Sequence, residues 1–279
     1  VDAAKKSQLE ELQADPDIAQ ELRALSMSEK LVQADKPAPK IRARKPAELV
    51  RFNAFDGSHK PNASTRQLVQ TVGFEALFRM THSFYQKCFV DSHVDTFIAD
   101  HDEPHPERFA LWIQEKFGDG TPWTQERRTR PKKYMKFGHE TRQVAHDRSS
   151  AHFAAWHSPK RDPADWGNHF KPEDARVWMR LHFWAAREAG MFEHEAFMEY
   201  YTRFIGHFMS VYSSKAPPFT RESLRWSEDP KNIQQYLDAG RRMTDVIGKD
   251  TESELAKLPA AERIYTGSRA RTAWPYEQR

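Results

Sequence analysis

The sequence predicts an all-α protein with a helical core and an extension at each end. Apolar side chains recur at helical spacing in several segments, and prolines and glycines stand where helices would begin and end. No alternating pattern of useful strand length occurs. We therefore divide the chain into an N-terminal arm (1–63), a globin-sized helical core (64–213) and a C-terminal extension (214–279).

The N-terminal arm combines helix-forming residues with prolines. Pro16 interrupts the segment 5–33, and residues 34–50, "ADKPAPKIRARKPAELV", bring prolines and basic residues together. We predict short helices here and no separate domain. Because the chain begins at Val1 without Met, and Glu alternates with Lys in its first residues, we interpret it as a mature form trimmed of a targeting peptide.

Two segments early in the core have the period of amphipathic helices. The first, within 65–90, places these residues on one wide apolar face: Leu77, Thr81, Phe84, Tyr85, Cys88 and Phe89. The second, within 107–120, places these residues at helical spacing: Phe109, Trp112, Ile113, Lys116 and Phe117. Gly118 and Gly120 follow, where a helix would end.

The rest of the core predicts an irregular segment and three helices. Residues 121–140 are basic and irregular, and a short helix is expected over about 141–157, closed by Pro159. Pro172 and the acidic residues after it begin a helix that Gly190 ends. The pattern repeats over 195–212 with these inward residues: Phe197, Tyr201, Phe204, Phe208 and Val211. Beyond Ser213 we expect one more helix, near 232–247.

Composition excludes several classes of protein. A net charge of +3, with interspersed charges, gives no indication of nucleic-acid binding. No apolar run approaches the roughly 20 residues that a membrane-spanning helix needs. A single cysteine, Cys88, excludes an intramolecular disulfide and a thiolate metal cluster, and favours a reducing compartment.

A helical core with a histidine on a late short helix, and aromatic residues on the helices around it, is typical of proteins that bury haem. The chain resembles the truncated haemoglobins, and more closely their second group. The resemblance rests on four stretches: "VGFEALFRMTHSFYQKCFVDSHVDTF", "HPERFALWIQEKFGDGTPWTQERR", "HSP" at 157–159 and "HFKPEDARVWMRLHFWAA". It covers about half of the chain and neither extension, and it implies haem b as cofactor.

The resemblance also implies roles for individual residues. His157 matches the proximal histidine that would bind the haem iron, and Tyr85 matches the tyrosine whose hydroxyl points at the iron's ligand. Phe97 matches a phenylalanine that packs against the haem face. The remaining pocket residues that it implies are His105 at the distal position, Phe109, Trp112 and Trp178.

Each of these roles has an alternative. Tyr85, Phe97, Phe109 and Trp112 could be ordinary core residues, and His157 could be a helix C-terminal histidine favoured by the helix dipole. His152 competes as the iron ligand, because the chain departs from the family around this helix. It has "GDGTP" where the family usually has Gly-Gly-Pro, and insertions before and after His157.

Two functions compete on this evidence. The first is a haem protein that binds oxygen, nitric oxide or another small ligand, with Tyr85, Trp178 and His105 as hydrogen-bond donors. The second is a haem-free subunit of a multiprotein assembly whose partner subunits are contacted by both extensions, since these are charged and proline-rich. Both suit an organelle, a mitochondrion before a plastid, and otherwise the cytoplasm. No catalytic residue set is evident.

Two short motifs have weaker interpretations. "HDEPH" at 101–105 has the residue types of a metal site, but its histidines flank Pro104 and most of its groups would face solvent. The basic run "ERRTRPKK" could contact phosphate, yet no aromatic platform accompanies it. We interpret the basic run as a solvated loop.

Overall fold

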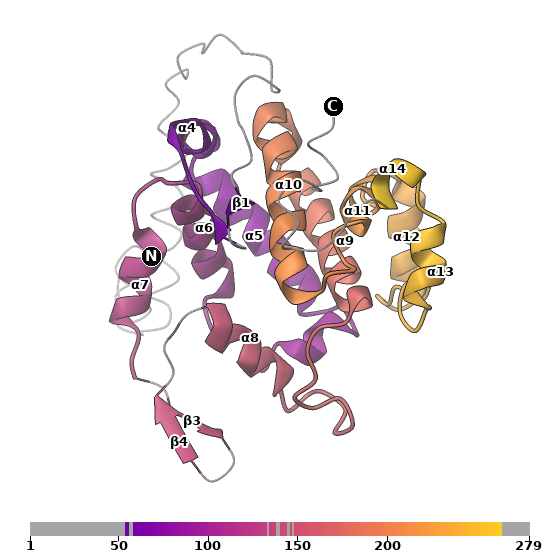
Figure 1. Ribbon diagram of the computed structural model, residues 1–279, viewed down its shortest axis with the longest axis horizontal. Helices are drawn as coiled ribbons and strands as arrows, with labels where there is room; N and C mark the ends of the chain where they lie inside the picture. Colours follow the sequence, from indigo (N-terminus) through magenta and orange to yellow (C-terminus); the bar gives the residue numbers. More distant parts are fainter. Residues whose placement is uncertain are drawn as a thin grey trace, which may run out of the picture. The chain divides into compact units, whose positions relative to one another are not determined.

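The computed structural model describes residues 54–55, 58–132, 134–137, 140–143, 146 and 148–263. The chain divides into two compact units, Val1–Arg44 and Lys45–Arg279, and all described residues belong to the second. This part is all-α, as predicted, with two short β-hairpins (Figure 1). The predicted helices of the segment 5–33 and the trimmed start lie outside the described residues.

The elements follow one another in this order: β1 (Ala54–Phe55), β2 (Ser58–His59), α4 (Ala63–Val72), α5 (Phe74–Cys88), the 3-10 helix η1 (Val94–Phe97), α6 (His105–Lys116), α7 (Pro122–Thr129), β3 (Tyr134–Phe137), β4 (Glu140–Gln143), α8 (Arg148–Trp156), α9 (Pro172–Glu188), the 3-10 helix η2 (Met191–Glu193), α10 (Glu195–Tyr212), α11 (Phe219–Trp226), α12 (Pro230–Asp238), α13 (Thr251–Ala256) and α14 (Ala260–Arg263).

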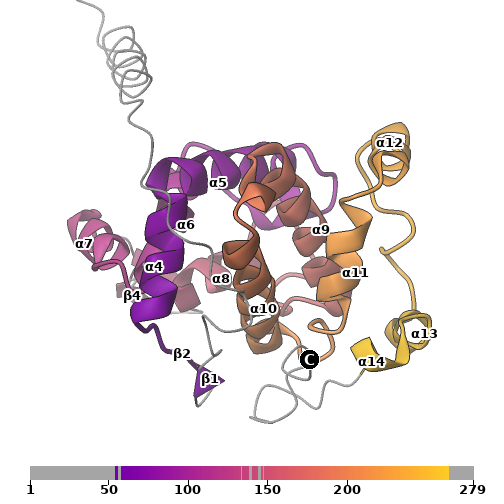
Figure 2. The same cartoon turned by 90° about the horizontal axis from the view of Figure 1, so that it is seen from above.

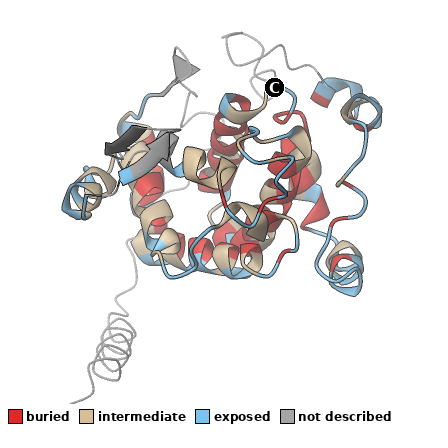
Figure 3. Cartoon of the chain, turned by 90° about the horizontal axis from the view of Figure 1, so that it is seen from below, coloured by how far each residue is buried: buried red, intermediate tan, exposed pale blue. Residues whose placement is uncertain are grey.

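Helix α5 is central, because it packs on α6 along one side and on α9 along another. Helix α10 completes the core, because its apolar side chains pack in the same cluster as those of α5, α6 and α9 (Figures 1 and 2). The fully covered core side chains include Leu77, Met80, Ile113, Phe183 and Phe204. Figure 3 shows that burial is concentrated in α5, α9 and α10, so these helices form the rigid frame on which a site can be built.

The junction between α4 and α6 shows why the predicted helix end at Gly118 is required. Asn62 and Thr65 form a capping box that begins α4, with 3.0 Å from the Thr65 amide to Asn62 Oδ1. A Cβ on Gly118 would lie 2.9 Å from Pro61 Cβ, and φ there is +93°. Glycine therefore allows the end of α6 to approach the start of α4.

The segment between α6 and α8 is more regular than predicted. Residues 121–140, interpreted from the sequence as irregular, contain α7 and the strand β3, which pairs with β4 in an antiparallel hairpin. Pro122 in the first turn and the ion pair between Glu126 and Arg130 explain α7. The hairpin takes up residues 140–143, so α8 begins at Arg148 and not near 141.

The C-terminal extension folds onto the core and contains several helices, whereas the sequence predicted one helix and contacts with partner subunits. Its described part, residues 214–263 and here called the C-terminal cap, forms α11 to α14, and α11 packs along α9. These cap side chains are buried: Phe219, Trp226, Tyr236, Met243, Val246 and Leu258. Helices α11 and α12 bury only one or two apolar side chains each, α13 and α14 bury none, and the other three buried residues lie between helices, so the sequence shows no periodic pattern.

No helix within the described ranges has both the length and the apolar character that crossing a membrane requires.

Candidate ligand-binding site

Helices α5, α6 and α9 together carry a continuous aromatic surface, which we call the aromatic wall. It consists of Phe84, Tyr85, His105, Phe109, Trp112, Trp178 and His182. Ring centroids lie 4.9 Å apart for Phe84 and Trp178 and 5.9 Å apart for Phe109 and Trp178. Edge and tilted contacts of this kind are favoured geometries for aromatic pairs, so the rings stabilise the packing of the three helices.

Tyr85 stands on the wall with an uncommitted hydroxyl. Its ring stacks on His105 at 5.2 Å, and the hydroxyl makes no hydrogen bond within the part of the chain that is described. Burial raises the pKa of this phenol well above its ordinary value, yet the side chain is only half-buried. The tyrosine is therefore neutral, surrounded by protein, and still able to donate to a small ligand.

His105 uses one ring nitrogen within the protein. Its Nε2 lies 2.8 Å from the backbone oxygen of Asp100, and a carbonyl can only accept, so Nε2 carries the proton. Burial lowers the pKa of this histidine, which favours the neutral ring. Because Nε2–H is donated to the loop, the other ring nitrogen of neutral His105 is an acceptor, so the ring has no further N–H for the predicted role of ligand donor.

Trp178 has a donor that is equally uncommitted. Its indole is half-buried, and its Nε1–H has no hydrogen-bond partner among the described residues. The indole lies flat on the imidazole of His182, with 4.7 Å between centroids and 9° between planes. Tyr85 and Trp178 thus bring two N–H or O–H donors to an otherwise apolar wall.

His182 lies behind Trp178 and was not predicted from the sequence. Its Nε2 is 2.8 Å from the Tyr201 hydroxyl, whereas its Nδ1 is buried with no partner in the described structure. Burial lowers the pKa of His182 to about 3, so the ring is neutral. The unpaired nitrogen costs about 1–3 kcal/mol. A histidine four residues after Trp178, on the same helix face, was the signal available in the sequence.

A second aromatic group involves α8, and we call it the α8 cluster. It consists of Phe97, His152, Trp156, Phe170 and Tyr212. His152 lies 4.4 Å from the Tyr212 ring and 5.7 Å from Phe170, which in turn lies 5.2 Å from Phe97. Tyr212 is one turn of α10 beyond Phe208, whose ring contacts Trp112 at 4.9 Å, so the α8 cluster borders the aromatic wall.

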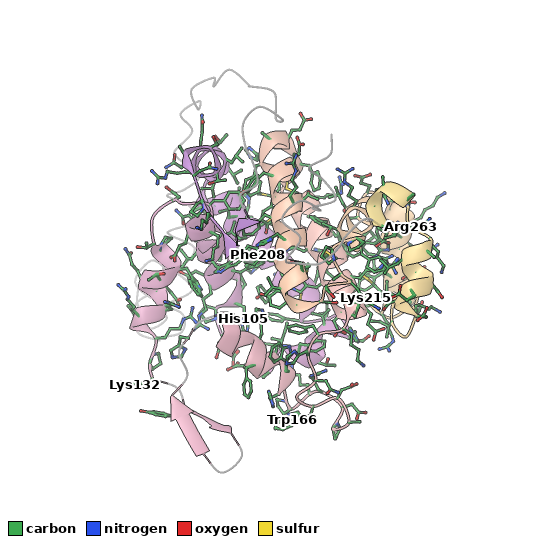
Figure 4. All side chains as sticks on the ribbon, in the orientation of Figure 1. His105, Lys132, Trp166, Phe208, Lys215 and Arg263 are labelled. Atoms are coloured by element: carbon green, nitrogen blue, oxygen red, sulfur yellow. The ribbon has the colours of Figure 1, made fainter. Side chains whose placement is uncertain are left out.

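His157, the predicted iron ligand, lies outside both groups. Its Nδ1 donates to the Phe153 carbonyl at 2.8 Å, and a Cβ on Gly167 would lie 3.3 Å from its Nε2. Trp166, in the loop after α8 (Figure 4), donates from Nε1 to the His157 carbonyl at 3.0 Å. This geometry matches the alternative role, a histidine that caps the C-terminal end of its helix.

The structure thus brings together Tyr85, His105, Phe109, Trp112 and Trp178, five of the seven residues that the resemblance implied. Phe97 belongs to the α8 cluster with His152, and His157 belongs to neither group. Of the two candidate iron ligands, His152 contacts Phe170 and Tyr212, whereas His157 contacts Trp166 in the loop after α8.

The histidines of "HDEPH" have separate partners. His101 Nε2 lies 2.5 Å from Asp95, and His105 bonds to the Asp100 backbone as described. Within the described ranges, no group of three or more His, Cys, Asp or Glu side chains is placed to hold a metal ion.

Comparison with known proteins gives no match for this chain among protein-family models, curated proteins or solved structures. Function is therefore argued from the site alone.

Proposed function

We propose that this chain is a haem protein, similar to the truncated haemoglobins, that binds a diatomic ligand beside the aromatic wall. The observation that carries the proposal is the pair of uncommitted donors, the Tyr85 hydroxyl and the Trp178 indole N–H, on half-buried rings of an apolar surface. Neither residue is fully buried, so both donors can be reached by a small ligand that enters from solvent.

The residues fit haem on the side of the aromatic wall. Phe109, Trp112 and Trp178 offer flat apolar contacts to a planar macrocycle. When bound, haem would supply an iron with an open coordination position for the diatomic ligand. Tyr85 and Trp178 would then donate hydrogen bonds to that ligand, and the apolar rings around them would exclude water.

On the side of α8, the fit depends on which histidine holds the iron. His152 suits the role by its place in the α8 cluster, close to Phe97. His157 has the correct tautomer, since its Nδ1 donates and its Nε2 is an acceptor, but Nε2 faces Gly167. We therefore assign the axial role to His152 and keep His157 as its competitor.

The test is haem titration of the purified full chain, followed by visible absorption. We expect a Soret band at one equivalent, lost or shifted in His152→Ala and retained in His157→Ala. The two variants are matched, because each removes one histidine, His152 within α8 or His157 directly after its last residue. Loss of the band in His157→Ala alone would reverse the assignment, and no band in the unmodified chain would overturn the haem proposal.

The second candidate is a haem-free subunit of an organellar assembly. The packing of the half-buried His157 imidazole against Phe153, Trp166 and Gly167 favours it, because this histidine would then have a purely structural role. The C-terminal cap counts against partner wrapping by residues 214–263, since its apolar side chains are already buried on the chain's own core. The predicted contacts of the N-terminal arm fall outside the described residues.

A further inference from the structure

The Tyr201–His182 pair lies directly behind the ligand-facing indole of the aromatic wall. Tyr201 projects from α10 and is completely buried, and its hydroxyl lies 2.8 Å from His182 Nε2. His182 in turn lies flat against Trp178. A chain of contacts therefore runs from Tyr201 on α10 to His182 and then to Trp178 on α9, at the surface of the aromatic wall.

We propose that Tyr201 and His182 are positioning residues that hold the Trp178 indole in its ligand-facing orientation. This inference rests on the proposed function of the wall, but its main readout does not require haem. Trp178 has no hydrogen bond of its own among the described residues, so only ring contacts orient it. Two of those contacts, with Phe84 and Phe109, are edge or tilted contacts, and the face of the indole rests on His182.

The hydrogen bond explains why a histidine occupies this place. A phenylalanine would fill the same apolar space without leaving a buried nitrogen unpaired, so stability alone does not favour histidine. Phenylalanine would, however, be free to rotate about its χ2 angle. It could then make an edge contact with the indole, which aromatic pairs favour as well as offset stacking. The Tyr201 hydroxyl fixes the plane of His182, and the 9° stack with Trp178 follows.

Both candidate tautomers of His182 are compatible with this role. Tyr201 can donate to Nε2 or accept from it, and in either case the bond orients the ring. The other nitrogen, Nδ1, remains buried without a partner in the described structure. The arrangement therefore leaves His182 Nδ1 without a hydrogen bond, while the bond at Nε2 fixes the plane of the ring.

The first experiment uses the full chain without haem, labelled with 15N at tryptophan, and follows the indole N–H resonances. The Trp178 resonance is assigned by its loss in Trp178→Phe. We expect it to shift or broaden in both Tyr201→Phe and His182→Phe, while the resonance of Trp226, in the C-terminal cap, stays in place. Tyr200→Phe is the matched control, since Tyr200 is the neighbouring tyrosine of α10 and packs on Phe117.

The second experiment uses the haem-loaded chain and measures the dissociation rate of a diatomic ligand. Tyr201→Phe is expected to raise the rate on the order of threefold or more, and to have no further effect in a Trp178→Phe background. A Trp178 resonance unmoved in both variants, or equal effects with and without Trp178, would overturn the positioning role. If haem does not bind, the proposed function fails while the resonance experiment still decides this inference.

Discussion

On one face of α9, Trp178 and His182 lie among aromatic rings, and on the opposite face Arg176 and Arg180 hold carboxylates of the C-terminal cap. The two pairs have the same i, i+4 spacing and are offset by two residues, which is about half a turn. Among the described residues, the Trp178 Nε1–H on the aromatic face has no hydrogen-bond partner, whereas each arginine on the other face forms two ion pairs, although Arg180 Nε is buried without a partner. The difference shows that ring contacts dominate the first face and ion pairs dominate the second.

The arginine face is a connected ionic network. Both arginines contact Glu222 of α11, and Arg176 also lies 2.9 Å from Glu254 of α13, while Arg180 lies 2.7 Å from Asp245. Burial alone would raise the pKa of Glu222, but hydrogen bonds and charges from the two arginines outweigh it and lower that pKa. The network therefore joins two helices of the cap to one helix of the core.

The largest expected effect comes from breaking this network at Arg180, whose side chain is only 2% exposed. Arg180→Ala removes both of its ion pairs and its contact with the Trp226 ring, and leaves Glu222 partly uncompensated. We expect the free energy of unfolding to fall by about 3–5 kcal/mol in urea titrations at pH 7. Arg180→Met, which keeps the apolar stem, separates the loss of charge from the loss of packing.

The matched control for that experiment is an exposed ion pair of the same cap, Lys215 with Glu252. Solvent screens this pair, so Lys215→Ala is expected to leave the urea midpoint unchanged. If the urea midpoint of Arg180→Ala equalled that of Lys215→Ala, the ion pairs between α9 and the C-terminal cap would not contribute to stability.

The next effect concerns the aromatic face and the hydroxyl of Tyr85. Tyr85→Phe keeps the ring stacked on His105 but removes the donor. In the haem-loaded chain we expect ligand dissociation to accelerate about tenfold or more, since such a bond contributes about 1.5–3 kcal/mol. The exposed Tyr134 provides the control, and an equal rate in Tyr85→Phe and Tyr134→Phe would assign Tyr85 to core packing alone.

The smallest effect is a pH dependence from His182. Its pKa in the folded chain is lowered to about 3, whereas an unfolded histidine has a pKa near 6.5. The contribution of neutral His182 to the free energy of unfolding is therefore fully present above about pH 6.5 and is lost as the pH falls towards 3. The reason is that, as the pH falls, the unfolded chain binds a proton at this histidine before the folded chain does. We expect a loss of about 2 kcal/mol between pH 7 and pH 5, and a correspondingly smaller loss in His182→Phe. Identical pH profiles for both proteins would show that His182 is solvated.

Much of the helical core could be predicted from local sequence. The prolines and glycines at 118, 172 and 190 stand close to the observed ends of α6 and α9, because capping and backbone conformation are properties of a few adjacent residues. The periodic apolar faces likewise predicted Phe84, Ile113 and Phe204 as core residues, and all three are buried. The prediction was wrong for Val211, which lies in the last turn of α10 and is exposed. The grouping of Tyr85, Phe109 and Trp178 was predicted only through the family resemblance.

Three features depended on contacts between distant residues. The C-terminal cap buries single apolar side chains against α9, and such isolated residues carry no period that a sequence window can detect. His182 lies among charged and apolar neighbours in the sequence, and only the hydroxyl of Tyr201, nineteen residues away, shows its function. The choice between His152 and His157 depends on which side of α8 faces α10.

The sequence by itself determined the fold class, the positions of the core helices and the residue types available for a ligand site, since these follow from periodicity, capping and composition. Only the tertiary structure decided that the donors of Tyr85 and Trp178 have no partner among the described residues, that His105 donates a hydrogen bond to a loop carbonyl, and that α11 of the C-terminal cap packs on α9. The physical reason is that hydrogen-bond partners and burial are set by side chains from different helices, and their distances exist only once the chain has folded.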